Sequence, residues 1–295
     1  MDQTSVILFF VDGVGIGEKN ENNPLSLTEN LEPFDNFVGI DKQIFADGIL
    51  IPTDARLGVD GRPQSASGQT AIYTGHNAPL LNGGHKHGFP NQKLRDLIAK
   101  HSIFLQLKQK GIEDSVFANA YVSKLLGKRP RFKSATTCAV EAAGMRFKTL
   151  PDLLGRKAVF HDFTNRSLIG YGLDVPEFTP KDAAEILISL ASENRFTLYE
   201  HFITDKIGHD QDFERAADHL PMIAEFVRET VKRIDPKRTT LILTSDHGNV
   251  ENLSIRNHTL NRVPTIIWGR KMRETADQIN DLTHITPAII GLLSE

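Results

Sequence analysis

The sequence of 295 residues contains one cysteine, one tryptophan and no long apolar run. The single cysteine, Cys138, excludes an intrachain disulfide and a cysteine-rich zinc site, and it predicts a cytoplasmic protein. No apolar stretch reaches the roughly 18 residues that a membrane-spanning helix needs, so we expect no membrane partner. Asp2 stands where a signal peptide would carry basic residues, and Asp12 ends the apolar run 6–11, which therefore predicts a buried strand.

An excess of either charge is also absent. The 34 lysines and arginines nearly balance the 37 aspartates and glutamates, for a net charge of −3 at pH 7. We therefore expect no nucleic-acid partner, because such proteins usually carry a basic excess. A composition of 40% hydrophobic and 24% charged residues excludes a disordered chain. The length allows one large domain or two small ones, and we expect a single domain over residues 1–295.

Short apolar runs predict the central strands of a sheet. They cover residues 6–11, 116–118, 158–160, 196–202, 239–244 and 264–268. Their continuous apolarity indicates burial on both faces, as in a parallel sheet. Helical patterns between the runs predict an α/β fold with helices on both sides of the sheet.

Three helices are predicted from periodicity and capping residues. They cover residues 179–193, 213–234 and 286 to the end of the chain, and Pro221 predicts a kink or a helix start inside the second. Residues 20–24 and 76–90 are rich in polar residues, glycine and proline, and they predict loops.

Acidic and imidazole side chains follow several of the predicted strands. The residues are Asp12, Asp205, His209, Asp246, His247 and His258. Each alone is more often a turn, cap or surface residue, but together they occupy one edge of one sheet, where α/β proteins bind ligands. Histidine and aspartate are ligands of Zn²⁺ and Mn²⁺. Six such groups suffice for two ions about 3.5–4 Å apart, an arrangement that supports in-line phosphoryl displacement.

The glycines at positions 13, 15 and 17 suggest an alternative, a dinucleotide-binding loop. That loop needs the pattern Gly-x-Gly-x-x-Gly at the start of an apolar helix. Here the third glycine comes one residue early and the polar stretch 18–24 follows. We favour a different interpretation, in which the glycines let the backbone approach a crowded site.

Residues 64–75 lead from a polar loop into a predicted short helix that is rich in small residues. A serine at a helix N-terminus lies at the positive end of the helix dipole, near N–H groups that can bind an anion. Ser65 and Ser67 are both candidates for a nucleophile, and either could instead cap the helix.

With this segment included, the sequence resembles the alkaline phosphatase superfamily. The motifs occur in the same order as in that family, and together they cover most of the chain. It is most similar to the branch of cofactor-independent phosphoglycerate mutases and phosphopentomutases, often called the metalloenzyme superfamily. The resemblance implies an alkaline phosphatase-like three-layer αβα sandwich with a mostly parallel central sheet, and it selects Ser65 as the nucleophile. It implies two divalent ions, Zn²⁺ or Mn²⁺. One ion set is Asp12, Ser65, Asp246 and His247, and the other is Asp205, His209 and His258.

The resemblance further implies an enzyme that acts on a small phosphorylated substrate through a phosphoserine. Mutase relatives carry a large domain inserted after the nucleophile segment, whereas only 140 positions separate Ser65 from Asp205 here. At most a small lid fits, within residues 121–178, so we expect a phosphoester hydrolase. The alternatives are a phosphomutase acting on a sugar or glycerate phosphate, and a phosphodiesterase or phosphonate hydrolase.

Some positions resemble the family less closely. Glu200 stands five residues before Asp205, as a magnesium ligand does in classical alkaline phosphatases, but residues 134–136 lack the aspartate of that third site. A third ion, Mg²⁺, is therefore doubtful, and Glu200 could instead accept a hydrogen bond from a ligating histidine. Candidate substrate contacts are Glu200, His85, His87, Arg129 and Arg131, with Lys133 beside them.

Overall fold

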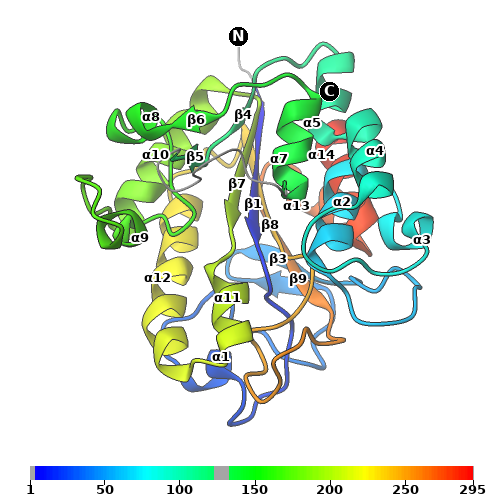
Figure 1. Ribbon diagram of the computed structural model, residues 1–295, viewed down its shortest axis with the longest axis vertical. Coiled ribbons are helices and arrows are strands. Elements are labelled where there is room, and N and C mark those ends of the chain that lie inside the picture. The colour runs from blue at the N-terminus through cyan, green and yellow to red at the C-terminus, as the bar shows by residue number, and fades with distance from the viewer. Residues whose placement is uncertain (1–3, 123–132, 295) are drawn as a thin grey trace.

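The computed structural model describes residues 4–122 and 133–294, and a seven-stranded sheet lies at its centre (Figure 1). The strand order is β2-β3-β9-β8-β1-β7-β4. The strands are β1 (Ser5–Val11), β2 (Gln43–Phe45), β3 (Gly48–Thr53), β4 (Ser115–Phe117), β7 (Phe196–His201), β8 (Thr239–Thr244) and β9 (Val263–Gly269). β1 pairs in parallel with both β7 and β8, so these three strands end at the same edge.

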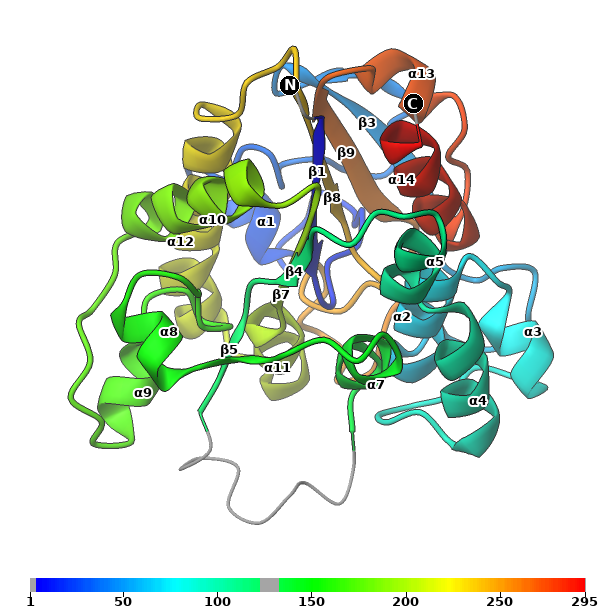
Figure 2. The ribbon, with the colours of Figure 1, turned by 90° about the horizontal axis from the view of Figure 1, so that it is seen from above.

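Helices cover both faces of the sheet (Figure 2). One layer contains α10 (Pro180–Glu193) and α12 (Phe213–Val231). The other contains α2 (Ser65–Thr74), α4 (Gln92–His101), α5 (Ile103–Gln109), α7 (Ala135–Ala142) and α14 (Ile285–Leu293). Alternate residues of β1 supply the two cores: Phe9 packs with the first layer and Phe10 with the second. This confirms the predicted α/β sandwich.

Shorter elements complete the chain. They are α1 (Pro24–Leu27), α3 (Ala78–Asn82), β5 (Ala120–Tyr121), β6 (Lys148–Thr149), α8 (Leu150–Leu154), α9 (Arg166–Gly170), α11 (Ile203–Asp210), α13 (Met272–Ala276) and the 3-10 turn η1 (Leu282–His284). The predicted loop 76–90 was therefore wrong at α3, and the loop 20–24 ends where α1 begins. Asn77 and Asn23 cap these helices with a proline following within two residues, a helix-start signal.

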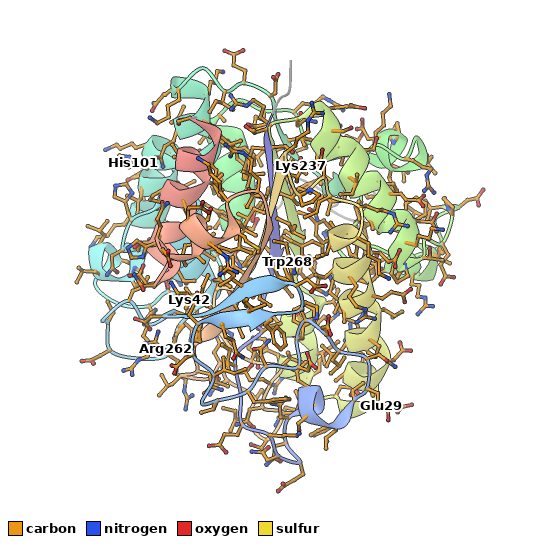
Figure 3. The ribbon with its side chains drawn as sticks, turned by 180° about the vertical axis from the view of Figure 1, so that it is seen from behind. Glu29, Lys42, His101, Lys237, Arg262 and Trp268 are labelled. Carbon is orange, nitrogen blue, oxygen red and sulfur yellow. The ribbon has the colours of Figure 1, made fainter. Side chains whose placement is uncertain are left out.

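The antiparallel part of the sheet was not predicted. β3 pairs with β9 and β2 pairs with β3, both antiparallel, so five of the seven strands run in one direction. Trp268 on β9 donates a hydrogen bond to the carbonyl of Ala46 in the turn between β2 and β3, at 2.6 Å, and Figure 3 labels it beside these strands. The sequence pattern missed β2 because it is a short edge strand, with Ile44 64% exposed.

The direction of β9 matters for the site. Since β9 runs opposite to β8, it starts at the edge where β1, β7 and β8 end. The loop 250–262 therefore returns to that edge, and it lies below the sheet in Figure 1 together with α11.

Other predicted elements differ in detail. The predicted strand 158–160 was wrong, because Val159 forms only an isolated bridge with Asn119. α12 does not start at Pro221, since the helix begins at Phe213 and runs through that residue, and a kink there stays a prediction. Within the stretch 121–178, α7 packs in the helical layer with α2, α4 and α5 rather than forming a lid. A lid in the rest of that stretch, and the single-domain organisation, stay predictions.

In the described ranges, 4–122 and 133–294, no helix combines the length and apolarity needed to cross a membrane.

The core predicts the effect of one substitution. The ring of Phe226 on α12 lies 4.9 Å from Phe9, 5.0 Å from Phe163 and 5.2 Å from Tyr199. Phe226→Ala should lower the free energy of unfolding by about 3–5 kcal/mol, because it leaves a cavity between the sheet and α12. Urea unfolding measures this loss. Phe213→Ala on the same helix is the control, since Phe213 is 41% exposed, and equal losses would contradict the packing.

Candidate metal centre

The six polar side chains that follow the strands meet at the carboxyl edge of the sheet, together with Ser65. Asp12 directly follows β1, and Asp246 and His247 are the second and third residues after β8. α11 carries Asp205 and His209, which lie four residues apart and so share one face of the helix. The remaining residue, His258, lies in the loop before β9.

The first cluster surrounds His247, whose side chain is fully buried. Its Nε2 atom lies 3.0 Å from Ser65 Oγ, 3.2 Å from Asp12 Oδ1 and 3.5 Å from Asp246 Oδ2. Ser65 is the first residue of α2, and the preceding residue makes no side-chain cap to the helix. Ser67, in contrast, donates to the carbonyl of Gln64 at 3.1 Å and accepts from the backbone of Lys86 at 3.0 Å. Of the two serines, only Ser65 points its hydroxyl at this cluster.

The second cluster contains Asp205 and two histidines. Nε2 of His209 lies 3.3 Å from Asp205 Oδ2, and Nε2 of His258 lies 3.6 Å from Asp205 Oδ1. The Nδ1 atoms are held by backbone carbonyls, of Arg256 at 2.9 Å for His209 and of Pro63 at 2.8 Å for His258. A carbonyl only accepts, so each Nδ1 carries a proton. In the neutral form of either ring, Nε2 then presents a lone pair, whereas the hydrogen bond with Asp205 raises the pKa of His209 and favours its protonated form.

Those two Nε2 atoms lie only 3.2 Å apart. When both rings are neutral, two lone pairs face each other at that distance and cannot form a hydrogen bond. A cation between them would satisfy both, because neutral imidazole nitrogen is a common metal ligand.

Asp205 lies between the two clusters. Its Oδ1 atom is 4.0 Å from His247 Nδ1, and ligand atoms of Asp12, Asp205 and His247 lie within 4.8 Å of one another. Asp205, His209 and His258 form the second group of this kind. The second group has the same residues as the predicted set. The first group contains Asp205, whereas the prediction has Asp246, whose Oδ2 atom lies 3.5 Å from His247 Nε2.

Gln69 on α2 links the two carboxylates of the first cluster. Its Nε2 atom donates to Asp12 Oδ2 at 3.0 Å and to Asp246 Oδ2 at 3.1 Å. Among the described residues, the Oδ1 atoms of both aspartates and Nδ1 of His247 are buried without a hydrogen-bond partner. Buried polar atoms without partners destabilise a fold unless something else satisfies them, and a divalent cation fits these oxygen and nitrogen atoms.

The electrostatics of the edge favour a cation as well. Burial raises the pKa of Asp12, and the negative charge of Asp205 raises it further. Burial likewise raises the pKa of Asp246 and lowers the pKa of His258 to about 3. For Asp205, burial acts to raise the pKa, but the hydrogen bond from His209 and the charges of two nearby histidines outweigh it and lower the pKa.

A family model described as the Metalloenzyme superfamily matches residues 4–294. The chain belongs to the Metalloenzyme superfamily. Among curated relatives, it is 28% identical over 127 residues to a 2,3-bisphosphoglycerate-independent phosphoglycerate mutase of Methanopyrus kandleri, covering 40% of this chain and 29% of that protein. It is 24% identical over 156 residues to the corresponding mutase of Ehrlichia ruminantium, covering 48% and 30%. The matched part of the chain thus spans less than a third of these relatives.

Solved structures of low sequence identity share the fold. The PH0037 protein from Pyrococcus horikoshii matches with a TM-score of 0.60 and 13% identity, covering 99% of this chain and 98% of that one. A cold-active alkaline phosphatase from a Shewanella species matches with a TM-score of 0.51 and 13% identity, covering 98% and 99%. The alkaline phosphatase-like fold of this superfamily member is therefore confirmed.

The glycines after β1 also fit the site of this metalloenzyme. Gly13 has a φ of +74°, and a Cβ atom there would lie 2.7 Å from Asp205 Cα. A Cβ on Gly15 would lie 2.2 Å from Glu251 Oε1. These separations are too short for any side chain, which confirms that the glycines permit close backbone approach.

The candidate substrate contacts are placed unevenly. The ring of His87 stacks 6.4 Å from that of His258, so it lies beside the second cluster. The ring of His85 lies near Gly61, and burial lowers the pKa of His85. Lys133 forms an exposed ion pair with Glu141 on α7, at 2.6 Å. The predicted contacts Arg129 and Arg131 lie outside the described residues.

Glu200 on β7 has a different environment from the one predicted. Its Oε1 atom accepts a hydrogen bond from Thr136 Oγ1 at 2.8 Å, and the Tyr73 hydroxyl lies 3.2 Å from the same Thr136 oxygen. Within the described part of the chain, its carboxylate receives no hydrogen bond from the three histidines of the two clusters. Ser134, in the stretch 134–136 that lacks the aspartate of the third site, caps α7.

Sequence analysis missed four residues that organise the site: Gln69, Asn249, Glu251 and Thr259. Each is a polar residue next to or within a motif that the sequence analysis used. Their side chains contact ligands or ligand-bearing loops rather than the open edge, which no local pattern reveals.

Burial of Glu200 generates a pH prediction. Burial raises the pKa of Glu200 from 4.5 to about 7, against a smaller opposing effect of the Thr136 hydrogen bond. The protonated group therefore stabilises the fold fully below pH 4.5, and this contribution is lost as the pH rises through about 7. Glu200→Gln keeps an acceptor for Thr136 and removes the titration.

The measurement is denaturant unfolding of metal-free protein from pH 4.5 to 8. Relative to Glu200→Gln, the wild-type chain should lose roughly 3 kcal/mol of stability across this interval. Parallel stability curves for the two proteins would show that Glu200 is not held protonated by its surroundings.

Proposed function

We propose that this chain is a phosphoryl-transfer enzyme that depends on two divalent metal ions and uses Ser65 as its nucleophile. The observation that carries the proposal is the position of Ser65 Oγ, 3.0 Å from His247 Nε2 at the first residue of α2. The Ser65 hydroxyl thus lies at a helix N-terminus and beside the His247 ring, which also contacts the buried carboxylates of Asp12 and Asp246. The favoured reaction is hydrolysis of a small phosphoester.

We assign the ligands in two sets. Asp12, Ser65, Asp246 and His247 hold one ion, and Asp205, His209 and His258 hold the other. The unpartnered Oδ1 atoms support the first set, and the facing Nε2 lone pairs support the second. When bound, the ions supply positive charge that lowers the pKa of the Ser65 hydroxyl and offsets the charge of the phosphoryl oxygens. Mixed nitrogen and oxygen ligands suit Zn²⁺ or Mn²⁺.

The chain's own groups account for the reaction sequence. Ser65 Oγ gives up its proton to solvent and attacks phosphorus. The bond from phosphorus to the leaving oxygen breaks, that oxygen takes a proton from water, and a phosphoserine remains. A water molecule then attacks phosphorus and gives up a proton, the bond to Oγ breaks, Oγ is protonated again, and phosphate is released. The first N–H groups of α2 have no partner inside the helix and no side-chain cap from Gln64, so they are available to the phosphoryl oxygens.

Two observations bear on the choice between hydrolase and mutase. Between Ser65 and Asp205 the described residues include six helices that belong to layers or edges of the single fold, α2, α3, α4, α5, α7 and α10, and the strands β4 and β7. That arrangement favours a hydrolase, because it leaves little chain for a second substrate-holding domain. The named activity of the curated relatives favours a phosphomutase as the second candidate.

The first experiment combines metal analysis with a substrate panel. The purified chain should contain two divalent ions and release phosphate from phosphomonoesters when Zn²⁺ or Mn²⁺ is present. Ser65→Ala should keep both ions and lose roughly 10³-fold or more in turnover, because the nucleophile is gone. Ser67→Ala is the matched control, since Ser67 bonds only to backbone groups among the described residues, and it should retain turnover.

Each result has a defined meaning. Undiminished turnover of Ser65→Ala would exclude the serine as nucleophile, and a wild-type chain without metal would exclude the two-ion assignment. Two bound ions with an isomerised phosphate product and little free phosphate would identify a mutase. Phosphate release from diesters or phosphonates alone would identify the remaining alternative.

A further inference from the structure

Glu251 is a buried carboxylate, 1% exposed, that lies outside both proposed ligand sets. It follows β8 by seven residues, in the turn that begins with Asp246. Its Oε2 atom accepts from the backbone N–H of Gly15 at 2.9 Å and of Asn249 at 2.7 Å. Its Oε1 atom accepts from the Thr259 hydroxyl and from Asn261 Nδ2, the latter at 3.0 Å. The two carboxylate oxygens thus accept four hydrogen bonds, two each.

The donors come from three segments, and each segment carries proposed metal ligands. Residues 12–17 begin with Asp12, residues 246–251 begin with Asp246 and His247, and residues 256–262 contain His258. Backbone bonds join the same segments, from Val250 N to Gly13 O at 3.0 Å and from Thr259 N to Gly248 O at 2.9 Å.

Asn249 extends the connection to α11. Its backbone N–H is held by Glu251, while its Nδ2 atom donates to Asp205 Oδ1 at 2.7 Å and to Asp205 O at 3.1 Å. A Cβ on Gly208 would lie 2.5 Å from Asn249 Cγ, so the amide is packed against the helix backbone. Through Asn249, the orientation of Asp205 depends on the position of Glu251.

We propose that Glu251 is a positioning residue that sets the spacing of the two metal-binding clusters. This inference rests on the proposed function, because it takes the clusters as metal sites. The reason for a carboxylate is chemical: an ionised carboxylate only accepts hydrogen bonds, and all four of its neighbours donate. An amide would place an NH₂ group against either two backbone N–H groups or the Thr259 and Asn261 donors, and the segments would have to separate.

A purely structural role for Glu251 makes a different prediction, and Asp162 supplies the comparison. Asp162 is also a buried carboxylate that accepts two backbone N–H groups, of Asn165 at 2.9 Å and of Ser167 at 2.6 Å. It holds the start of α9, away from the ligand-bearing loops. Asp162→Asn therefore imitates the loss of a buried acceptor without disturbing the clusters.

The experiment titrates metal-free wild-type, Glu251→Gln and Asp162→Asn proteins with Mn²⁺ and with Zn²⁺ by calorimetry, and records the Tm of each. We expect Glu251→Gln to weaken metal binding by roughly 10–100-fold, the usual effect of losing a group that orients ligands. Asp162→Asn should lower Tm and leave metal affinity at the wild-type value. Wild-type affinity in a folded Glu251→Gln protein would overturn the inference.

A second variant keeps the test decisive if Glu251→Gln does not fold. Thr259→Val removes one hydrogen-bond donor to Glu251, next to His258, at nearly constant side-chain volume. It should therefore lower the affinity for the ion of the second set, Asp205, His209 and His258, more than the affinity for the other ion. Unchanged affinity for both ions would overturn the inference. A wild-type chain that binds both ions but releases no phosphate would contradict the proposed reaction and leave this comparison intact.

Discussion

Negative charge and nitrogen lone pairs that are removed from water at one edge of the sheet set the main physical constraint on this molecule. Asp12, Asp205 and Asp246 each have a carboxylate oxygen within 4.0 Å of the His247 ring, and Asp12 and Asp246 are buried. Burial alone would favour protonated carboxyls, as the raised pKa of Asp12 and Asp246 indicates. Positive charge at this edge is the simplest way to keep such groups ionised, and the surrounding fold holds them in place for it.

The topology explains how so distant residues meet. β1, β7 and β8 are parallel neighbours, so their ends bring together chain positions near 12, 202 and 245. The antiparallel β9 contributes its beginning to the same edge and delivers His258. α2 points its N-terminus there and brings Ser65 beside His247. One reversed strand is therefore as important to the site as the parallel strands.

The core strands, and the meeting of the candidate site residues at one edge of the sheet, could be predicted because both leave local signals. Continuous apolar runs indicated β1 and β8, and the acidic and histidine residues within three positions of a strand end indicated Asp12 and His247. β2 and β3 could not be predicted, since β2 is exposed and its turn depends on Trp268 far along the chain. The environment of Glu200 was also hidden, because its partner Thr136 is distant in sequence. Local patterns report burial and periodicity, whereas these features depend on contacts between distant segments.

The glycines of this chain differ in how freely they can be replaced during sequence drift. At Gly15 and Gly248 the obstacle is volume, since a methyl group would lie within 2.2 Å and 2.1 Å of the Glu251 carboxylate. At Gly83 nothing lies within 4 Å, and only a φ of +85° disfavours a side chain, which asparagine tolerates at modest cost. Gly170 and Gly291 have neither restriction. Homologous chains that build the same edge should thus keep the first pair and vary at the last.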